Sequence, residues 1–462
     1  MRKSWLIGIA LALVVGAAIW IEASRPDPWT TSSPQALAEY ERGRQAQMKF
    51  YFADAAAAFE RALELDPSFV AAKLALLDTD RSKEDRDRLI AELRDADRSR
   101  LSERERFLLD VLFARVDGDE KRRRELVADY LAEHPRDPWA LHIESADAWS
   151  RQDWPVAQAT YRRLLEVDPN WLLARNHLGY IAMAQGRFQE AENEFRTYRF
   201  AAPDQANPHD SLGELLILLG RYDEARAELE EALRVRPDFC ASYQNLLRIT
   251  VFDRRPGDID PIVARIERHC DERTVEEARC AALIAKAFLT GDDDAPWRAA
   301  DGVCKGRLER PDVLLHMLAL RSGRRAEALA MEEKGKKLLM ELEGAPERAK
   351  SGYRALLTYL EAERLMSEGR HAEAVPKLRE VDADATWWQS AGGGAIRLVA
   401  RLALANALEA LGDRAGAEAA LERVRAVNPA FATWYGTFDP LAPHAGRAPA
   451  TAGPANAPAG PL

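Results

Sequence analysis

Cysteine is scarce in this chain, and the few residues present argue against a thiolate metal centre. The four cysteines are Cys240, Cys270, Cys280 and Cys304. None of them belongs to a C-x-x-C pair, and no histidine lies at zinc-finger spacing from them. We therefore expect no metal site in this protein.

Recognisable catalytic motifs are missing as well. The chain has no H-E-x-x-H, no G-x-S-x-G and no Walker motif, and its 8 histidines are scattered along the sequence. The glycine-rich stretch 391–395 lacks both a Gly-Lys-Ser/Thr ending and a preceding strand, so it predicts a flexible connection and not a phosphate loop. The sequence therefore predicts a protein that is not an enzyme and binds no cofactor.

The chain also has no excess of positive charge. Its 65 lysines and arginines are outnumbered by 75 acidic residues, which gives a net charge of −10. The basic run at 121–124 is typical of a solvated helix face. We therefore expect no nucleic-acid partner, because such proteins present a basic surface to phosphates.

Long apolar runs are limited to one, at residues 4–21, which carries no charged side chain. That length is about the minimum for a helix that crosses a bilayer. Arg2 and Lys3 precede the run, and this arrangement keeps the N-terminus on the cytoplasmic side. The pattern predicts a signal anchor over residues 1–22, with the rest of the chain outside the cytoplasm.

A second interpretation of the same run is a cleaved signal peptide. Residues 16–18, Gly-Ala-Ala, offer a small-x-small cleavage site, and cleavage there would leave a secreted protein. The apolar run continues through residues 19–21, which favours the uncleaved anchor. The sequence leaves both interpretations open.

Beyond these absences, the chain contains a repeated 34-residue unit, seen best in residues 172–205. Its main features are a small residue in a first helix, a glycine turn, an alanine and an aromatic residue in a second helix, and a closing proline: Gly179, Gly186, Ala191, Phe195 and Pro203. The small residues allow two antiparallel helices to approach closely, and we expect Phe195 to fill the space toward the next pair. Proline stops the second helix because it lacks an amide hydrogen.

Closing prolines recur on one 34-residue grid, at Pro67, Pro135, Pro169, Pro203 and Pro237. At an average proline usage of about 5%, chance would give the four further matches roughly once in 10⁵. With the L-G and A-x₃-F patterns, this spacing resembles the tetratricopeptide repeat family, and in particular the arrays of bacterial membrane-anchored receptor and regulator proteins. The resemblance implies an all-α solenoid, a right-handed superhelix of about eleven antiparallel helix pairs behind an N-terminal transmembrane helix.

The repeat frame divides the chain into six segments. We expect a membrane anchor, a Pro/Ser/Thr linker, regular repeats, degenerate repeats that hold the cysteines, C-terminal repeats and a disordered Pro/Ala/Gly tail, at residues 1–22, 23–35, 36–239, 240–308, 309–438 and 439–462 respectively.

In this family, the first helices of successive repeats line a groove that binds peptides or partner helices. Mapping the family's groove positions onto the best-formed repeats gives Trp139, His142, Trp149, Asn176, Tyr180, Asn207, Asp210 and Glu214. Aromatic side chains with a few polar groups suit a peptide groove. An alternative is that Trp139 and Trp149 pack inside the array.

The repeat frame also bears on the cysteines. Cys240 and Cys270 occupy positions one and thirty-one of the 34-residue repeat at 240–273. These two positions lie at the same end of an antiparallel helix pair. Cys280 and Cys304 occupy positions seven and thirty-one of the next slot, which is a poorer alignment. An oxidising compartment would permit disulfides Cys240–Cys270 and Cys280–Cys304, and four free thiols remain the alternative.

The resemblance implies a function in protein binding. We expect a scaffold tethered to a bacterial membrane, with the array on the extracytoplasmic side and a protein or peptide as partner. The alternative is an envelope assembly factor that captures client peptides in the groove.

Overall fold

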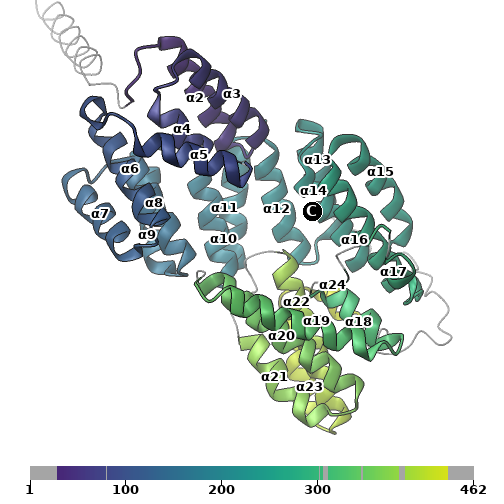
Figure 1. Ribbon diagram of the computed structural model, residues 1–462. Helices are drawn as coiled ribbons and strands as arrows, with labels where there is room; N and C mark the ends of the chain where they lie inside the picture. The colour runs from purple at the N-terminus through teal and green to yellow at the C-terminus, as the bar shows by residue number, and fades with distance from the viewer. Residues whose placement is uncertain are drawn as a thin grey trace, which may run out of the picture. The chain divides into compact units, whose positions relative to one another are not determined.

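A computed structural model of the chain describes residues 29–79, 81–300, 302–304, 308, 311–344, 347–383 and 391–434. Every regular element in these ranges is a helix (Figure 1). None of the described helices is long and apolar enough to span a membrane. The expected anchor at 1–22 and tail at 439–462 lie outside the described residues.

The helices belong to two compact units, and the chain passes from one to the other within α8. Unit 1 comprises Met1–Glu144 with Glu166–Trp171, and unit 2 comprises Ser145–Leu165 with Leu172–Leu462. The helices up to this division are α2 Pro34–Met48, α3 Phe52–Leu65, α4 Val70–Leu76, α5 Lys83–Arg94, η1 Arg98–Arg100, α6 Glu103–Val116, α7 Glu120–Glu133 and α8 Pro138–Ser150.

Unit 2 contains the longer run of helices. These are α9 Trp154–Val167, α10 Leu173–Ala184, α11 Phe188–Ala201, α12 Ala206–Leu218, α13 Tyr222–Val235, α14 Cys240–Phe252, η2 Pro256–Asp258, α15 Ile259–His269, α16 Glu272–Thr290, α17 Ala295–Arg298, α18 Val313–Arg321, α19 Arg325–Glu341, α20 Glu347–Ser367, α21 His371–Ala383, α22 Ala391–Ala410, α23 Arg414–Arg425 and α24 Pro429–Ala432. Taken two at a time, α2 to α23 form eleven consecutive pairs, as expected from the repeat frame.

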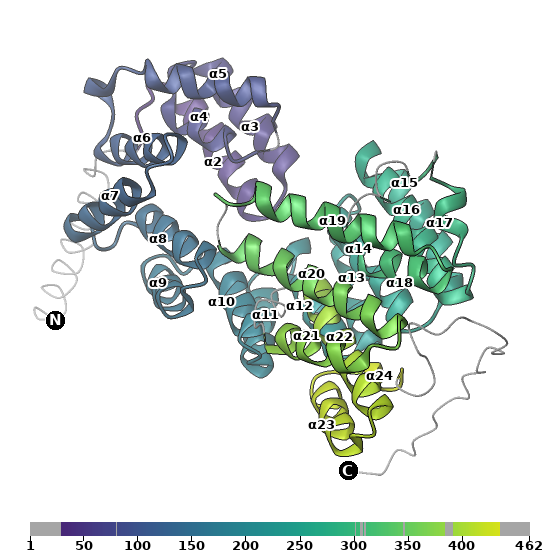
Figure 2. The same ribbon diagram turned by 60° about the horizontal axis from the view of Figure 1, so that its bottom comes forward.

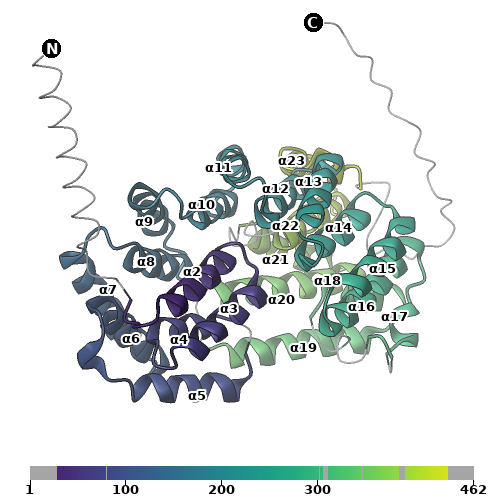
Figure 3. The ribbon, with the colours of Figure 1, turned by 90° about the horizontal axis from the view of Figure 1, so that it is seen from above.

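Close approach within a pair depends on the glycine of the first helix. A Cβ atom on Gly179 would lie 2.5 Å from the Phe195 ring, which sits directly over it. Gly43 and Phe59 repeat this arrangement in unit 1, at 2.4 Å. The aromatic ring therefore packs on the glycine of its own pair, which differs from our expectation that it fills the space toward the next one. In Figure 3, α10 and α11 are seen nearly end-on, side by side.

The segment expected to be a linker, 23–35, is partly integrated into unit 1. Trp29 is 5% exposed, and its ring centre lies 5.3 Å from that of Tyr40. The Thr30 amide donates a hydrogen bond to Glu105 (3.0 Å), and α2 begins at Pro34. The Pro/Ser/Thr composition did not predict this docking, because a single buried tryptophan is enough to hold the segment on unit 1.

Two other segments differ from the sequence-based expectation. Residues 391–395, expected to be a flexible connection, form the beginning of α22. Glycine weakens a helix by about 1 kcal/mol per residue, but the strongly helical sequence that follows propagates the helix back through it. In the repeat expected at residues 274–307, the second helix is only the four-residue α17.

Both cysteine pairs discussed above are joined in the structure. Cys240 and Cys270 form one disulfide, with a Cα–Cα distance of 6.0 Å, and Cys280 and Cys304 form another, at 4.9 Å. Both distances lie in the range that a disulfide requires. The first bond joins the start of α14 to the residue that follows α15, and the second joins α16 to the segment after α17.

Unit 2 closes on itself through its last repeat. Asn428, just before α24, donates hydrogen bonds from Nδ2 to the Tyr222 hydroxyl (3.2 Å) and the Ile217 carbonyl (3.4 Å). Its Oδ1 accepts from the Phe431 amide at 2.8 Å. We call this set of contacts the Asn428 clasp. The α22 helix packs beside α12, although more than 170 residues separate them in sequence (Figure 2).

Candidate functional site

The two groove candidates of unit 1 lie in an aromatic cluster. The Trp139 ring centre is 5.2 Å from that of Trp29 and 5.6 Å from that of Trp171, and the Arg44 guanidinium lies 3.9 Å from the Trp139 ring centre. His142 lies 5.3 Å from Trp171. These contacts favour packing inside the unit as the main role of Trp139.

Trp149, the first candidate of unit 2, also contacts other rings. Its ring centre lies 5.4 Å from that of Trp154 and 5.5 Å from that of His177. The side chain is half-buried. Trp149 is thus held in place by its neighbours while part of its surface remains open to solvent.

Three other candidates form a hydrogen-bonded ladder across α10, α12 and α14. The Tyr180 hydroxyl donates to Glu214 at 2.6 Å. Asp210, one turn before Glu214, accepts from Ser242 at 2.7 Å and from Asn245 at 3.1 Å. The spacing of four residues places both carboxylates on one face of α12. The structure therefore brings together Tyr180, Asp210 and Glu214 as the sequence frame suggested.

Burial of the ladder changes its acid–base behaviour. Burial raises the pKa of Asp210 to about 6; the Ser242 hydrogen bond lowers it, and the Glu214 charge raises it further. Burial and the Glu214 and Asp210 charges raise the pKa of Tyr180 well above its ordinary value. Asp210 is only 6% exposed and lies inside the array, and the raised pKa of Tyr180 keeps its hydroxyl protonated as the hydrogen-bond donor to Glu214.

The two asparagine candidates are buried. Asn207 is 6% exposed and donates to the Tyr198 hydroxyl at 3.2 Å. Asn176 is 5% exposed, and its Oδ1 has no hydrogen-bond partner among the described residues. Neither side chain presents the open face that a docking contact needs.

A groove that the candidate set missed continues from the ladder along the first helices of the next repeats. It leaves about 300 Å³ of free space and is lined by Gln244, Leu247, Arg248, Val251, Glu277, Ala278, Ala281, Ala285 and Leu314. We call it the A-helix groove. Gln244, Arg248 and Val251 occupy positions five, nine and twelve of their slot. The register used for the regular repeats would have found them had it been extended to the degenerate one.

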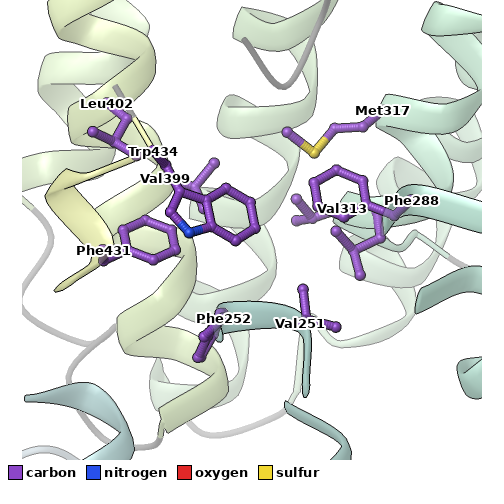
Figure 4. Close-up of a pocket in the computed structure, with 10 residues that line it drawn as sticks. Val251, Phe252, Phe288, Val313, Met317, Val399, Leu402, Phe431 and Trp434 are labelled. Atoms are coloured by element: carbon purple, nitrogen blue, oxygen red, sulfur yellow. The ribbon is translucent and has the colours of Figure 1, made fainter. Parts of the chain in front are cut away.

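An apolar pocket adjoins this groove and shares Val251 and Leu314 with it. It leaves about 40 Å³ of free space and is lined by Val251, Phe252, Phe288, Val313, Leu314, Met317, Val399, Leu402, Phe431 and Trp434. Figure 4 shows the Trp434 indole between Phe431 on one side and Phe288 and Val313 on the other.

One exposed group in unit 1 brings potential metal ligands together. Ligand atoms of Glu103, Glu133 and His134 lie within 4.8 Å of one another. Both glutamates are exposed, and His134 Nε2 lies 3.2 Å from Glu103. A surface ion pair accounts for this arrangement, and we assign no metal to it.

Comparisons with known protein families identify repeats in two adjoining segments of the chain. Family models described as tetratricopeptide repeat match residues 146–206 and 206–239. No curated protein matches the chain.

Solved structures with some likeness include a chain from the crystal structure of the APC/C hetero-tetramer Cut9-Hcn1. It has a TM-score of 0.42 and 14% identity, over 85% of this chain and 74% of that chain. The crystal structure of the P58(IPK) TPR domain has a TM-score of 0.23 and 11% identity, over 85% and 92%. The matched segments identify residues 146–239 of this chain as tetratricopeptide repeats.

Proposed function

We propose that this protein is a binding scaffold, and that the A-helix groove of unit 2 is where a partner protein docks. The observation that carries the proposal is the alignment of ladder and groove along α10, α12, α14, α16 and α18. Tetratricopeptide repeats are protein-interaction modules, and first helices of successive repeats line these surfaces. A partner segment lying across them would contact one helix after another.

The groove offers groups for both parts of a peptide. Gln244 and Glu277 are exposed and polar, so they are able to bond the main chain of an extended segment. The Arg248 guanidinium donates to Asn245, which in turn donates to Asp210. The small side chains at Ala278 and Ala281 leave room for the segment to approach α16.

Site-specific photocrosslinking in cells tests this proposal. A photoreactive residue is placed at Gln244, in the groove, and in a matched variant at Ala264, an exposed position on α15 outside it. We expect a crosslinked partner from Gln244 and none from Ala264. Equal adducts from both positions, or adducts from Ala264 alone, would contradict the proposal.

Co-purification then distinguishes a scaffold from an assembly factor. A scaffold should yield a stable complex with the crosslinked partner. Adducts that form only with newly made proteins, without a stable complex, would instead favour an envelope assembly factor that captures client peptides.

We further propose that residues 4–21 tether the protein to a bacterial membrane, with the array outside the cytoplasm. The uncharged run and the preceding Arg2 and Lys3 support this orientation. The two disulfides of unit 2 support an oxidising compartment. Protease added to spheroplasts should digest the array and leave cytosolic markers intact. An array protected from the protease would refute the proposed topology, and release of the intact array into the periplasm would favour cleavage of a signal peptide.

A further inference from the structure

The two disulfides of unit 2 differ in how open they are to solvent. Cys280 and Cys304 are 1% and 0% exposed and belong to the hydrophobic core of the unit. Cys240 and Cys270 are both half-buried, and the Cys240 sulfur lies at the surface, 3.3 Å from the Asp238 carbonyl oxygen. Thiol–disulfide exchange requires a thiolate to reach one of the two sulfurs, so only the Cys240–Cys270 bond is open to this reaction.

The position of Cys240 also favours cleavage of its bond. Cys240 is the first residue of α14, where the helix dipole is positive. The N-cap residue Phe239 supplies no side-chain acceptor, and the first turn of α14 contains no acidic residue. The Asp238 carboxylate, two residues before Cys240, is paired with Arg236 at 2.5 Å. A thiolate at Cys240 is therefore stabilised by the helix, which makes this sulfur the better leaving group.

The bond fixes the end of a helix that serves both the ladder and the groove. Ser242 and Asn245, near the start of α14, are buried and donate to Asp210 on α12. Gln244 and Arg248, on the neighbouring face of α14, line the A-helix groove. The disulfide ties the start of α14 to the residue that follows α15. Opening it therefore releases the end of α14 that carries these side chains.

Other contacts keep the repeat together when the bond is open. Tyr243 on α14 is 1% exposed, and its hydroxyl donates to the Pro237 carbonyl at 3.1 Å. The Arg265 guanidinium on α15 lies 5.1 Å from the centre of the Tyr243 ring and pairs with Glu230 on α13 at 2.7 Å. None of these contacts involves a sulfur atom. We therefore expect opening to loosen the start of α14 without unfolding its repeat.

We propose that Cys240–Cys270 is a site of thiol–disulfide exchange with an external dithiol, of the kind that dithiol oxidoreductases carry, and that its opening loosens the docking surface. One thiolate of the dithiol attacks the Cys270 sulfur, and Cys240 leaves as a thiolate with the electron pair of the broken bond. The second thiol, after losing its proton, attacks the mixed disulfide, displaces Cys270 and closes the disulfide of the reagent. The dithiol is oxidised by two electrons, and its two protons pass through solvent to the two cysteines. Only the effect on docking rests on the proposed function.

Limited reduction followed by peptide mapping tests the exchange. The folded protein is treated briefly with dithiothreitol, and the free thiols are alkylated and located by mass spectrometry. We expect alkylated Cys240 and Cys270, with reduction of Cys280–Cys304 slower by about tenfold or more. In urea, which unfolds the protein, the two bonds should be reduced at similar rates. Equal rates in the folded protein, or faster reduction of Cys280–Cys304, would overturn the proposal.

A monothiol identifies the sulfur that is attacked. When glutathione replaces dithiothreitol and the free thiols are trapped at once, the mixed disulfide should lie on Cys270 and the alkyl group on Cys240. Glutathione found mainly on Cys240 would overturn the assigned step.

Hydrogen exchange measures what opening does to the helices. After selective reduction, the amides of residues 244–248 in α14 and 210–214 in α12 should exchange faster, while those of α21 and α23 serve as internal control and should not change. The double variant Cys240→Ser with Cys270→Ser, which cannot close the bond, should reproduce this pattern. Unchanged exchange in α14 and α12 would overturn the proposed loosening. Faster exchange throughout unit 2 would show that the bond is only structural and would overturn it as well.

Photocrosslinking from Gln244 separates this inference from the proposed function. Per molecule of protein, the partner adduct should be weaker in the double variant than in the wild type. An equal adduct in both proteins would overturn the effect on docking and leave the scaffold proposal standing. The absence of an adduct in both proteins would count against the scaffold proposal alone, because the thiol map and hydrogen exchange test the disulfide without a partner.

Discussion

The stability of unit 2 is expected to fall between neutral and alkaline pH, mainly because His316 loses its proton. Replacing His316 by glutamine should therefore make the free energy of unfolding much less dependent on pH. His316 lies on α18 and is fully buried. Its Nδ1 lies 2.7 Å from Glu363 on α20, and its Nε2 lies 3.3 Å from Glu332 on α19. Arg364 also donates to Glu332 (2.8 Å), and the Tyr359 hydroxyl donates to Glu363 (2.6 Å). The ring therefore joins three helices through two carboxylates.

The size of the effect follows from the pKa of His316. Burial alone lowers that pKa, but the hydrogen bonds and charges of Glu332 and Glu363 outweigh burial and raise it from 6.5 to about 9. Since the folded pKa is the higher one, the stabilisation is fully present below pH 6.5 and is lost as pH rises through about 9. At about 1.36 kcal/mol per pKa unit, this difference is worth about 3 kcal/mol.

Urea unfolding of the wild type and His316→Gln at about pH 6 and about pH 10 measures this effect. We expect the free energy of unfolding of the wild type to fall by about 3 kcal/mol more than that of the variant. His269→Gln, at an exposed position, serves as control and should behave like the wild type. All four cysteines are disulfide-bonded, so no thiol titrates in this interval. Equal pH dependence in the wild type and His316→Gln, or an NMR titration that places the pKa of His316 at 6.5 or below, would refute the reasoning.

Three other changes are expected to alter stability, each measured by urea unfolding against the wild type. Gly179→Ala should destabilise by about 1–3 kcal/mol because the new Cβ meets the Phe195 ring, whereas Gly352→Ala, in open space on a helix, should stabilise by up to about 1 kcal/mol; equal effects would contradict the close approach. Asn428→Ala should cost about 1–3 kcal/mol and speed amide exchange in α24, and unchanged exchange would show that the clasp is not needed. Loss of the 30-residue disulfide loop in the double variant Cys240→Ser with Cys270→Ser should cost about 3.5 kcal/mol, and a non-reducing peptide map with all four thiols alkylated would remove the basis of this prediction.

The repeat frame was predictable from the sequence because its residues act locally. Gly179 and Phe195 lie sixteen positions apart and meet in one helix pair, so their spacing is readable along the chain. Cys240 and Cys270 lie at the two ends of one repeat, and the frame alone brings them to the same side. The ladder is similar, since Tyr180 and Glu214 differ by one repeat length and stack on neighbouring helices.

The apolar pocket was not predictable in this way. Phe431 and Trp434 come from the far end of the chain, and no repeat spacing relates them to Phe252 or Phe288. Trp139 was misleading for a related reason, since its groove position in the frame is also where Trp29 docks from outside the repeats. In each unit, these contacts join residues that are far apart in the sequence and are not related by the repeat spacing. The periodic pattern therefore does not predict them.

The Asn428 clasp also sets the order in which the protein is completed. Most contacts in a repeat array join residues less than two repeats apart, so the helix pairs form quickly and can form while the chain is still being made. The clasp instead joins residues 217–222 to 428–431 and has to wait until the last repeat has been synthesised. The pocket walls at Phe431 and Trp434 are therefore the last part of unit 2 to assemble. A ribosome-bound chain that ends before Asn428 lacks these contacts, so only the finished protein has the clasp.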